Sequence, residues 1–319
     1  MSHDFLAIGD AVVDDFIRLK DAEVACDINK ENCTICMRFG DKVPFESSTI
    51  VYGVGNAGNA AVSAARLGLK TAFITSIGKD DRGDRIVKYY RSEKIDTKHV
   101  VQHKNLPTNY HYVLWYGDER TILVHQQRYP FAGMKKAPNV KAVYLSSLFD
   151  ETGAYHDEIA EWLEKHPNIF FAFQPGVFEI KMGVEKLNRL YKRAHLFFAN
   201  KEEYRRILND ETSDIPALLT KMNALGPKNP VLTDARNGAY ALDGSEIIHV
   251  PMFPDPKAPV ERTGAGDAFS STTAAFMTLG LPLKDAMLRG TVNSAYVVQE
   301  IGAQKGLLTR AELESKLTP

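Results

Sequence analysis

The segment with the most specific chemistry is the glycine-rich run Glu261–Phe269, which leads into an alanine-rich stretch. Gly264 and Gly266 let the backbone turn sharply and approach a ligand closely. A helix predicted to begin there would present unpaired backbone N–H groups, which favour an anion. Asp267 would stand in its first turn, where a carboxylate can accept a proton from a hydroxyl. The run therefore predicts a general base beside an anion hole formed by Gly264, Ala265 and Gly266, which suits phosphoryl transfer. Because Asp is also a favoured N-cap residue, a plain loop before a helix is the alternative.

A second glycine-rich run, Tyr52–Ala61, also precedes an alanine-rich helical pattern. Its two asparagines, Asn56 and Asn59, offer both donors and acceptors to a ligand with several hydroxyls. The glycines at positions 53, 55 and 58 also match a dinucleotide-binding spacing. However, that spacing should follow the first strand of the main sheet, and here the preceding strand belongs to a segment outside it.

Two further motifs follow buried strands. Asn200 and Glu203 open a helix and match a capping box, and they are also suited to ordering water around Mg²⁺, which takes few protein ligands. Thr233, Arg236 and Gly238 combine a hydroxyl, a cation and a turn, which suits a nucleotide or a simple hairpin.

Short apolar runs alternate with amphipathic patterns, which predicts a parallel sheet covered by helices on both faces. The predicted strands are Phe5–Ile8, Thr71–Ile77, Ala142–Leu145, Ile169–Phe173, Leu196–Ala199 and Val231–Leu232. The predicted helices are Ala57–Leu67, Arg82–Glu93, Asp157–Lys165, Lys201–Leu208, Ile215–Leu225, Ala268–Leu279, Leu283–Glu300 and Arg310–Lys316.

Residues 11–52 and 107–127 depart from this rhythm, because they are rich in β-branched and aromatic residues in rough alternation. We expect these two segments to pair into a small sheet that forms a lid. The large α/β domain would then comprise residues 1–10, 53–106 and 128–319. The apolar face and exposed edges of such a lid favour a homodimer.

Composition excludes several classes of protein. The 319 residues carry 39 Lys plus Arg and 40 Asp plus Glu, so no general field attracts nucleic acid. The sequence has no membrane-spanning apolar run and no signal peptide, and we expect a cytoplasmic protein that binds neither nucleic acid nor membrane. Cys26, Cys33 and Cys36 do not form a framework of structural disulfides. These three cysteines are more simply interpreted as small apolar residues of a hairpin than as zinc ligands, because a structural zinc site requires four ligands.

With these motifs in hand, the chain resembles the ribokinase-like, PfkB-type carbohydrate kinase family over essentially its whole length. The order of the motifs carries the resemblance as much as their identity. They are Gly9 with Asp14, Gly55–Asn59 with Leu67-Gly68, Ile77–Gly83, Asn200 with Glu203, Thr233–Gly238 and Thr263–Asp267.

The resemblance implies a three-layer α/β sandwich with a mostly parallel central sheet and a small β-sheet lid. It implies that Asp267 activates a hydroxyl beside the anion hole, and that the substrate is bound by Asp14, Gly55, Asn56 and Asn59. Residues implied to bind ATP and its Mg²⁺ are Asn200, Glu203 (Mg²⁺ through water), Thr233, Arg236 and Gly238, with Asn293, Gly302 and Ala303 as walls of the adenine pocket.

Three positions depart from the family pattern. Val54 replaces one glycine of a pair, and Gln174-Pro175-Gly176 stands where the family usually has a different polar strand end. Glu261 and Arg262 occupy positions that the family often fills with Asp and Thr near a monovalent-cation site. Glu261 keeps the carboxylate, whereas the Arg262 guanidinium can itself supply positive charge, so a potassium requirement is left open.

Together these features predict an ATP-dependent kinase that phosphorylates a hydroxyl of a monosaccharide. A nucleoside is the second acceptor, because aromatic lid residues such as Tyr110 and Trp115 can stack on a base. A noncatalytic sugar- or nucleotide-binding regulator and a dinucleotide-dependent oxidoreductase are the alternatives from other classes.

Overall fold

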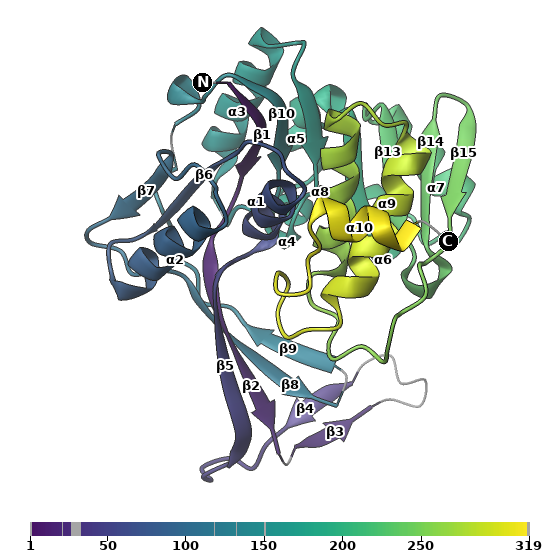
Figure 1. Ribbon diagram of the computed structural model, residues 1–319. Coiled ribbons are helices and arrows are strands. Elements are labelled where there is room, and N and C mark those ends of the chain that lie inside the picture. The colour runs from purple at the N-terminus through teal and green to yellow at the C-terminus, as the bar shows by residue number, and fades with distance from the viewer. Residues whose placement is uncertain are drawn as a thin grey trace.

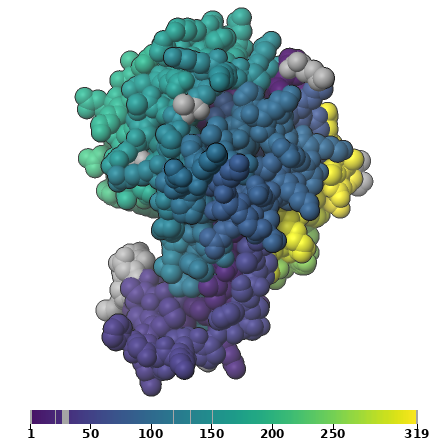
Figure 2. Space-filling view, turned by 90° about the vertical axis from the view of Figure 1, so that its left-hand side faces the viewer, coloured from purple at the N-terminus to yellow at the C-terminus, as the bar shows by residue number. Residues whose placement is uncertain are grey.

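A large sheet forms the body of the molecule, and a smaller sheet projects from it (Figures 1 and 2). The computed structural model describes residues 2–20, 22–26, 33–117, 119–131, 133–149 and 151–317. Within these ranges, no helix has both the length and the apolar character needed to cross a membrane.

The large sheet has nine described strands in the order β15-β14-β13-β12-β11-β10-β1-β6-β7. Neighbours from β13 to β7 pair in parallel, whereas β14 and β15 add an antiparallel edge. The strands are β1 (His3–Ile8), β6 (Thr71–Gly78), β7 (Val100–His103), β10 (Val140–Leu145), β11 (Phe170–Phe173), β12 (Leu196–Asn200), β13 (Asn229–Thr233), β14 (Ala239–Asp243) and β15 (Glu246–Val250).

Helices cover both faces of this sheet and create a core on each side. Strand residues alternate between the two cores: in β1, Phe5 and Ala7 pack on one side and Leu6 and Ile8 on the other. On the first side lie α1 (Asn56–Arg66), α2 (Asp81–Ser92), α8 (Ala265–Thr278), α9 (Leu283–Val297) and α10 (Arg310–Leu317). On the other lie α3 (Gly153–Lys165), α5 (Val184–Arg193), α6 (Lys201–Leu208) and α7 (Ile215–Ala224). Shorter elements are α4 (Val177–Met182), η1 (Met134–Lys136) and η2 (Ala235–Asn237).

The predicted sandwich is confirmed, and each predicted core strand and helix forms, with ends that differ by a few residues. The elements missed are β7, β14, β15, α4 and α5. Of these, α5 carried a readable signal, because its buried residues Leu187, Leu190 and Tyr191 recur at helical spacing.

The smaller sheet, here the lid sheet, has the order β5-β2-β8-β9. Its strands are β2 (Val12–Leu19), β5 (Phe45–Val54), β8 (Tyr110–Tyr116) and β9 (Glu119–Leu123). The two segments predicted to pair do so along the parallel β2–β8 contact, which joins Asp14 to His111 in register. The insert between β2 and β5 is separate: β3 (Glu23–Ala25) and β4 (Thr34–Cys36) form their own two-stranded sheet.

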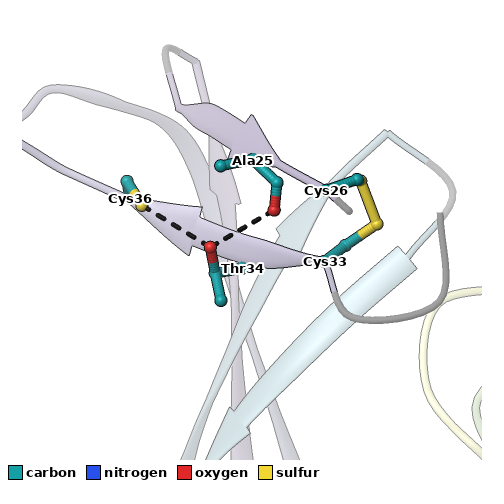
Figure 3. Close-up of a disulfide and its surroundings, with 5 residues drawn as sticks. All are labelled: Ala25, Cys26, Cys33, Thr34 and Cys36. Atoms are coloured by element: carbon teal, nitrogen blue, oxygen red, sulfur yellow. Dashed lines mark hydrogen bonds between the residues drawn. A yellow bond between two sulfur atoms is a disulfide. The ribbon is translucent and has the colours of Figure 1, made fainter. Parts of the chain in front are cut away.

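The cysteines in this insert correct the prediction. Cys26 and Cys33 form a disulfide and are exposed, so they are not apolar hairpin residues (Figure 3). Antiparallel pairing explains the bond, because Ala25 faces Thr34 and the next residues on each strand are the two cysteines, with Cα atoms 4.0 Å apart. Cys36 is free and exposed. The residues between the bonded cysteines, 27–32, lie outside the described ranges.

Arg66, at the end of α1, ties this helix to the C-terminal loop. Its guanidinium donates to both carboxylate oxygens of Glu93, at 2.9 and 2.6 Å, and to the carbonyls of Gln304 and Leu307, at 2.6 and 3.0 Å. Since Arg66 and Glu93 are mostly shielded from solvent, this arrangement fixes the loop that carries Gln304 against α1.

We expect Arg66→Met to lower the free energy of unfolding by about 2–4 kcal/mol, because it leaves a shielded carboxylate and two carbonyls without their donor. Urea denaturation measures the change. Arg85→Met is the matched control: Arg85 also pairs with a carboxylate, Asp81, but both side chains are exposed, so we expect almost no change in the free energy of unfolding. Equal losses in the two variants would contradict the anchoring role of Arg66.

Candidate active site

Helix α8 begins at an uncapped turn. Gly264 is its N-cap residue with φ 81°, and no side chain accepts a hydrogen bond there, so Asp267 is not the cap. Glycine is required at 264 for space as well, because a Cβ would lie 2.3 Å from the Cβ of Ala303. A Cβ on Gly266 would meet nothing within 4 Å. The Ala265 amide makes a long contact of 3.5 Å with the Arg262 carbonyl, and the described residues give no hydrogen bond for the Gly264 and Gly266 amides. A helix start of this kind favours an anion.

The Asp267 carboxylate, in that first turn, is held by two side-chain amides. Its Oδ2 accepts from Asn59 Nδ2 at 2.7 Å, and its Oδ1 accepts from Gln174 Nε2 at 3.0 Å. Asn59 lies on α1 and Gln174 follows β11, so two distant parts of the chain orient one carboxylate. Gln174 was noted in the sequence only as a departure from the family pattern.

Asn59 is itself oriented by a third side chain. Gln304 Nε2 donates to Asn59 Oδ1 at 2.9 Å and to the Gly53 carbonyl at 2.7 Å. Because Asn59 Oδ1 is thus occupied, its amide nitrogen must face Asp267. Asn59 was predicted as a substrate ligand. It is 5% exposed, and its side-chain amide donates a hydrogen bond to the Asp267 carboxylate. The sequence offered no signal for Gln304.

Burial is the largest influence on the pKa of Asp267 and raises it. The hydrogen bonds from Asn59 and Gln174 and the positive charge of Arg120 oppose that rise, and the net pKa stays above the ordinary value. A carboxyl group with a raised pKa is a better proton acceptor than a free aspartate.

A cavity of about 530 Å³, here the larger cavity, lies between α8 and the lid sheet. The predicted substrate residues Asp14, Gly55, Asn56 and Asn59 line it together with Gly264, Ala265, Gly266 and Asp267. Several buried polar atoms in its wall have no hydrogen-bond partner within the described chain: Asp14 Oδ1, His111 Nε2, Arg120 Nε, Gln126 Oε1 and Thr263 Oγ1. Asp14 Oδ1 lies 3.3 Å from His111 Nδ1. Unpaired buried polar groups at one place favour a ligand rich in hydroxyls or charge.

A smaller cavity of about 300 Å³ opens beside the larger one. The two share Thr233, Arg262, Ala265, Gly266 and Phe269 in their walls. The smaller cavity is mainly apolar, and the predicted nucleotide residues Thr233, Arg236 and Gly238 line it, with Ala239, Met252, Ala295 and Val298.

The residues predicted as adenine-pocket walls lie in different surroundings. Asn293 is fully buried; its Nδ2 donates to Thr272 Oγ1 at 2.8 Å and its Oδ1 accepts from the Leu308 amide at 2.9 Å. It therefore joins α8 to the C-terminal segment, and its neighbours Ser294 and Ala295 line the smaller cavity. Gly302 lines neither cavity and donates its amide to Glu261 Oε1, while Ala303 lines the larger one.

Asn200 and Glu203 form the capping box of α6. The Glu203 amide donates to Asn200 Oδ1 at 2.9 Å and the Asn200 amide to Glu203 Oε2 at 2.8 Å. Both residues also line the larger cavity. Burial raises the pKa of Glu203, and the charge of Asp267 adds to the rise. Glu203 Oε1 has no hydrogen-bond partner in the described residues, which suits a Mg²⁺ ion bound mainly through water.

The glycines that match the dinucleotide spacing lie where close neighbours leave no room for a side chain. A Cβ on Gly58 would lie 2.7 Å from the Gly53 carbonyl and 2.8 Å from Tyr90 Oη, and one on Gly55 would lie 2.9 Å from the Asp10 carbonyl. The preceding strand, β5, belongs to the lid sheet. The spacing therefore follows from the close contact of α1 with α2 and β1.

Known proteins of similar sequence or fold include several kinases. The chain is 25% identical over 285 residues to the ATP-dependent 6-phosphofructokinase of Thermoanaerobacterium thermosaccharolyticum, covering 83% of this chain and 84% of that protein. It is 24% identical over 273 residues to a nucleoside kinase of Methanothermobacter thermautotrophicus, covering 83% and 84%. The fold matches the structure of Arabidopsis thaliana ribokinase complexed with ribose and ATP, with a TM-score of 0.82, 19% identity and 100% of both chains covered.

The pfkB family carbohydrate kinase model matches residues 21–310, which is most of the chain. The chain belongs to the pfkB family of carbohydrate kinases.

Proposed function

We propose that the protein transfers the γ-phosphoryl group of ATP to a hydroxyl of a monosaccharide. The observation that carries the proposal is the position of Asp267, which lies in the first turn of α8, in the wall of the larger cavity and beside the uncapped amides. PfkB-family kinases are ATP-dependent phosphotransferases, which supports this reading. The family supports phosphotransfer from ATP, and the monosaccharide acceptor is the part that we add to it.

In the proposed mechanism, Asp267 Oδ accepts the proton of the acceptor hydroxyl while Asn59 and Gln174 hold the carboxylate in place. The amides of the Gly264–Gly266 turn stabilise negative charge that develops on the transferred group. Arg262 lines both cavities, so its guanidinium adds positive charge where they meet. The lid sheet covers the acceptor and excludes water, which would otherwise compete for the phosphoryl group.

Mg²⁺ supplies charge neutralisation of the nucleotide phosphates when bound, and Glu203 and Asn200 would hold it through water. Bound ATP supplies the phosphoryl group. Thr233, Arg236 and Gly238 would contact the nucleotide from the smaller cavity, whose apolar wall suits a purine ring.

A monosaccharide ranks first because the unpaired polar atoms of the larger cavity favour an acceptor with several hydroxyls. A nucleoside is the second candidate, supported by the kinship with a nucleoside kinase. Release of ADP on mixing with ATP, Mg²⁺ and a panel of sugars and nucleosides distinguishes these two acceptors. A noncatalytic binder would release none.

The outer face of the lid sheet supports the predicted homodimer. Ile50, Tyr112 and Leu123 are exposed and form one row across the sheet, since register pairs both Ile50 and Tyr112 with Asp15 and pairs Tyr112 with Leu123. A second copy would bury this apolar row.

Asp267→Asn removes the proton acceptor while preserving the shape of the side chain. We expect kcat to fall about 10²- to 10⁴-fold, with ATP affinity and the thermal unfolding midpoint nearly unchanged. Coupled ADP-release kinetics and calorimetric ATP binding measure the two effects. A variant that keeps most of its turnover would refute the base assignment.

Gln174→Ala tests how Asp267 is tuned. The donated hydrogen bond favours the ionised carboxylate and lowers its pKa, so its loss raises that pKa further. The base must be ionised to act, and we therefore expect the acid limb of the pH profile of kcat/KM to move to higher pH. Gln304→Ala, which releases Asn59, should move it in the same direction. Unmoved profiles in both variants would count against Asp267 as the titrating group.

Arg262→Ala tests the charge at the junction of the cavities. Within the described residues, the Arg262 guanidinium makes no hydrogen bond or ion pair, so it can contact a phosphate. We expect the KM for ATP to rise about tenfold, the loss of one charge-assisted hydrogen bond. Lys305→Ala is the control, because Lys305 is exposed and paired with Glu300. An unchanged KM for ATP in Arg262→Ala would contradict the assignment.

A further inference from the structure

Arg120 lies on the cavity-facing side of the lid sheet. It is the second residue of β9, and Arg120, Ile122 and Val124 alternate along the chain and all line the larger cavity. Register places Arg120 opposite Trp115, which in turn pairs with Arg18 on β2. Arg18, Trp115 and Arg120 therefore form one row across the lid sheet, and of these only Arg120 lines the cavity.

The guanidinium of Arg120 lacks the carboxylate partners that Arg66 and Arg289 have. Arg66 donates to both oxygens of Glu93, and Arg289 donates to both oxygens of Glu314. In contrast, Arg120 Nε is buried without a hydrogen-bond partner, and the described residues give Arg120 no ion pair. Its charge acts on Asp267, but without a direct hydrogen bond. A planar guanidinium without a partner is suited to donate two parallel hydrogen bonds to a carboxylate or a phosphate.

Arg120 lies on the acceptor side of the site. Arg262 and the first turn of α8 line the junction of the two cavities, where the nucleotide phosphates would lie. Arg120 lines only the larger of the two cavities, and it belongs to the lid sheet, on the acceptor side. This position favours an anion that arrives with the acceptor.

We infer that the acceptor carries an anionic group, a phosphate or a carboxylate, in addition to the hydroxyl that is phosphorylated, and that Arg120 binds this group. The inference rests on the proposed phosphotransfer and narrows its substrate class. Asp14 and His111 would bind the remaining hydroxyls of a small sugar.

The test compares matched neutral and anionic acceptors. The set is ribose with ribose 1-phosphate, ribose 5-phosphate and ribonate; fructose with fructose 6-phosphate; and adenosine with adenosine 5′-monophosphate. We expect kcat/KM for one anionic member to exceed that of its neutral counterpart by about 100-fold, the contribution of a desolvated charge pair. The phosphate and carboxylate arms separate the two kinds of anion. Preference for a neutral acceptor throughout would overturn the inference.

Variants assign the preference to Arg120. We expect Arg120→Gln to lower kcat/KM for the preferred anionic acceptor by about 100-fold, mainly through KM, and to lower it about tenfold more than for the neutral counterpart, whose loss reports the effect on Asp267. Arg120→Lys should recover part of the loss, because the charge remains. Arg18→Gln is the control, since Arg18 lies in the same row, is half exposed and pairs with Glu46. An equal loss on neutral and anionic acceptors in Arg120→Gln would instead assign Arg120 to Asp267 alone and overturn the inference.

Calorimetric binding separates this inference from the proposed function. Arg120-dependent binding of an anionic sugar without any ADP release would support the inference while the phosphotransfer proposal fails. ADP release with neutral acceptors alone would support phosphotransfer and overturn the inference. Absence of both binding and turnover across the set would overturn both.

Discussion

A carboxylate fixed at the uncapped start of a helix is the constraint on which the site depends. Asp267 must face the larger cavity, lie beside the free amides of α8 and remain able to ionise although it is buried. Two amide donors, Asn59 and Gln174, meet the first and last requirements together, because they orient the carboxylate and oppose the effect of burial on its pKa. The remainder of the fold brings these groups to one place.

That place is the carboxyl edge of the parallel strands. Gln174 follows β11, Asn200 ends β12 and Thr233 ends β13, and all three line the cavities. Open α/β sheets generally bind ligands at this edge. The C-terminal loop completes the site through Gln304, and Arg66 anchors that loop to α1, so a stability element and the orientation of the base share one network.

The sequence predicted the parts of the fold that depend on local pattern. Buried strands and amphipathic helices follow from apolar periodicity, and the glycine-rich turn before α8 follows from residue type. The site was predictable where a motif is contiguous, as at Gly264–Asp267. It was not predictable where partners are distant in sequence: Gln174 and Gln304 meet Asp267 and Asn59 only through tertiary packing. The surroundings of Asn293 were not predictable either, because residue type and helix position do not tell which side of α9 a residue faces, and Asn293 faces α8. The Cys26–Cys33 bond required knowledge of the β3–β4 register.

A structure of the complex with an unreactive ATP analogue, Mg²⁺ and the preferred acceptor would test the central claim most directly. The account predicts the acceptor hydroxyl oxygen within hydrogen-bond distance of an Asp267 Oδ atom, in line with the γ-phosphorus, and the phosphate oxygens on the amides of the Gly264–Gly266 turn. A hydroxyl bound out of reach of Asp267, or a γ-phosphate bound away from these amides, would contradict it.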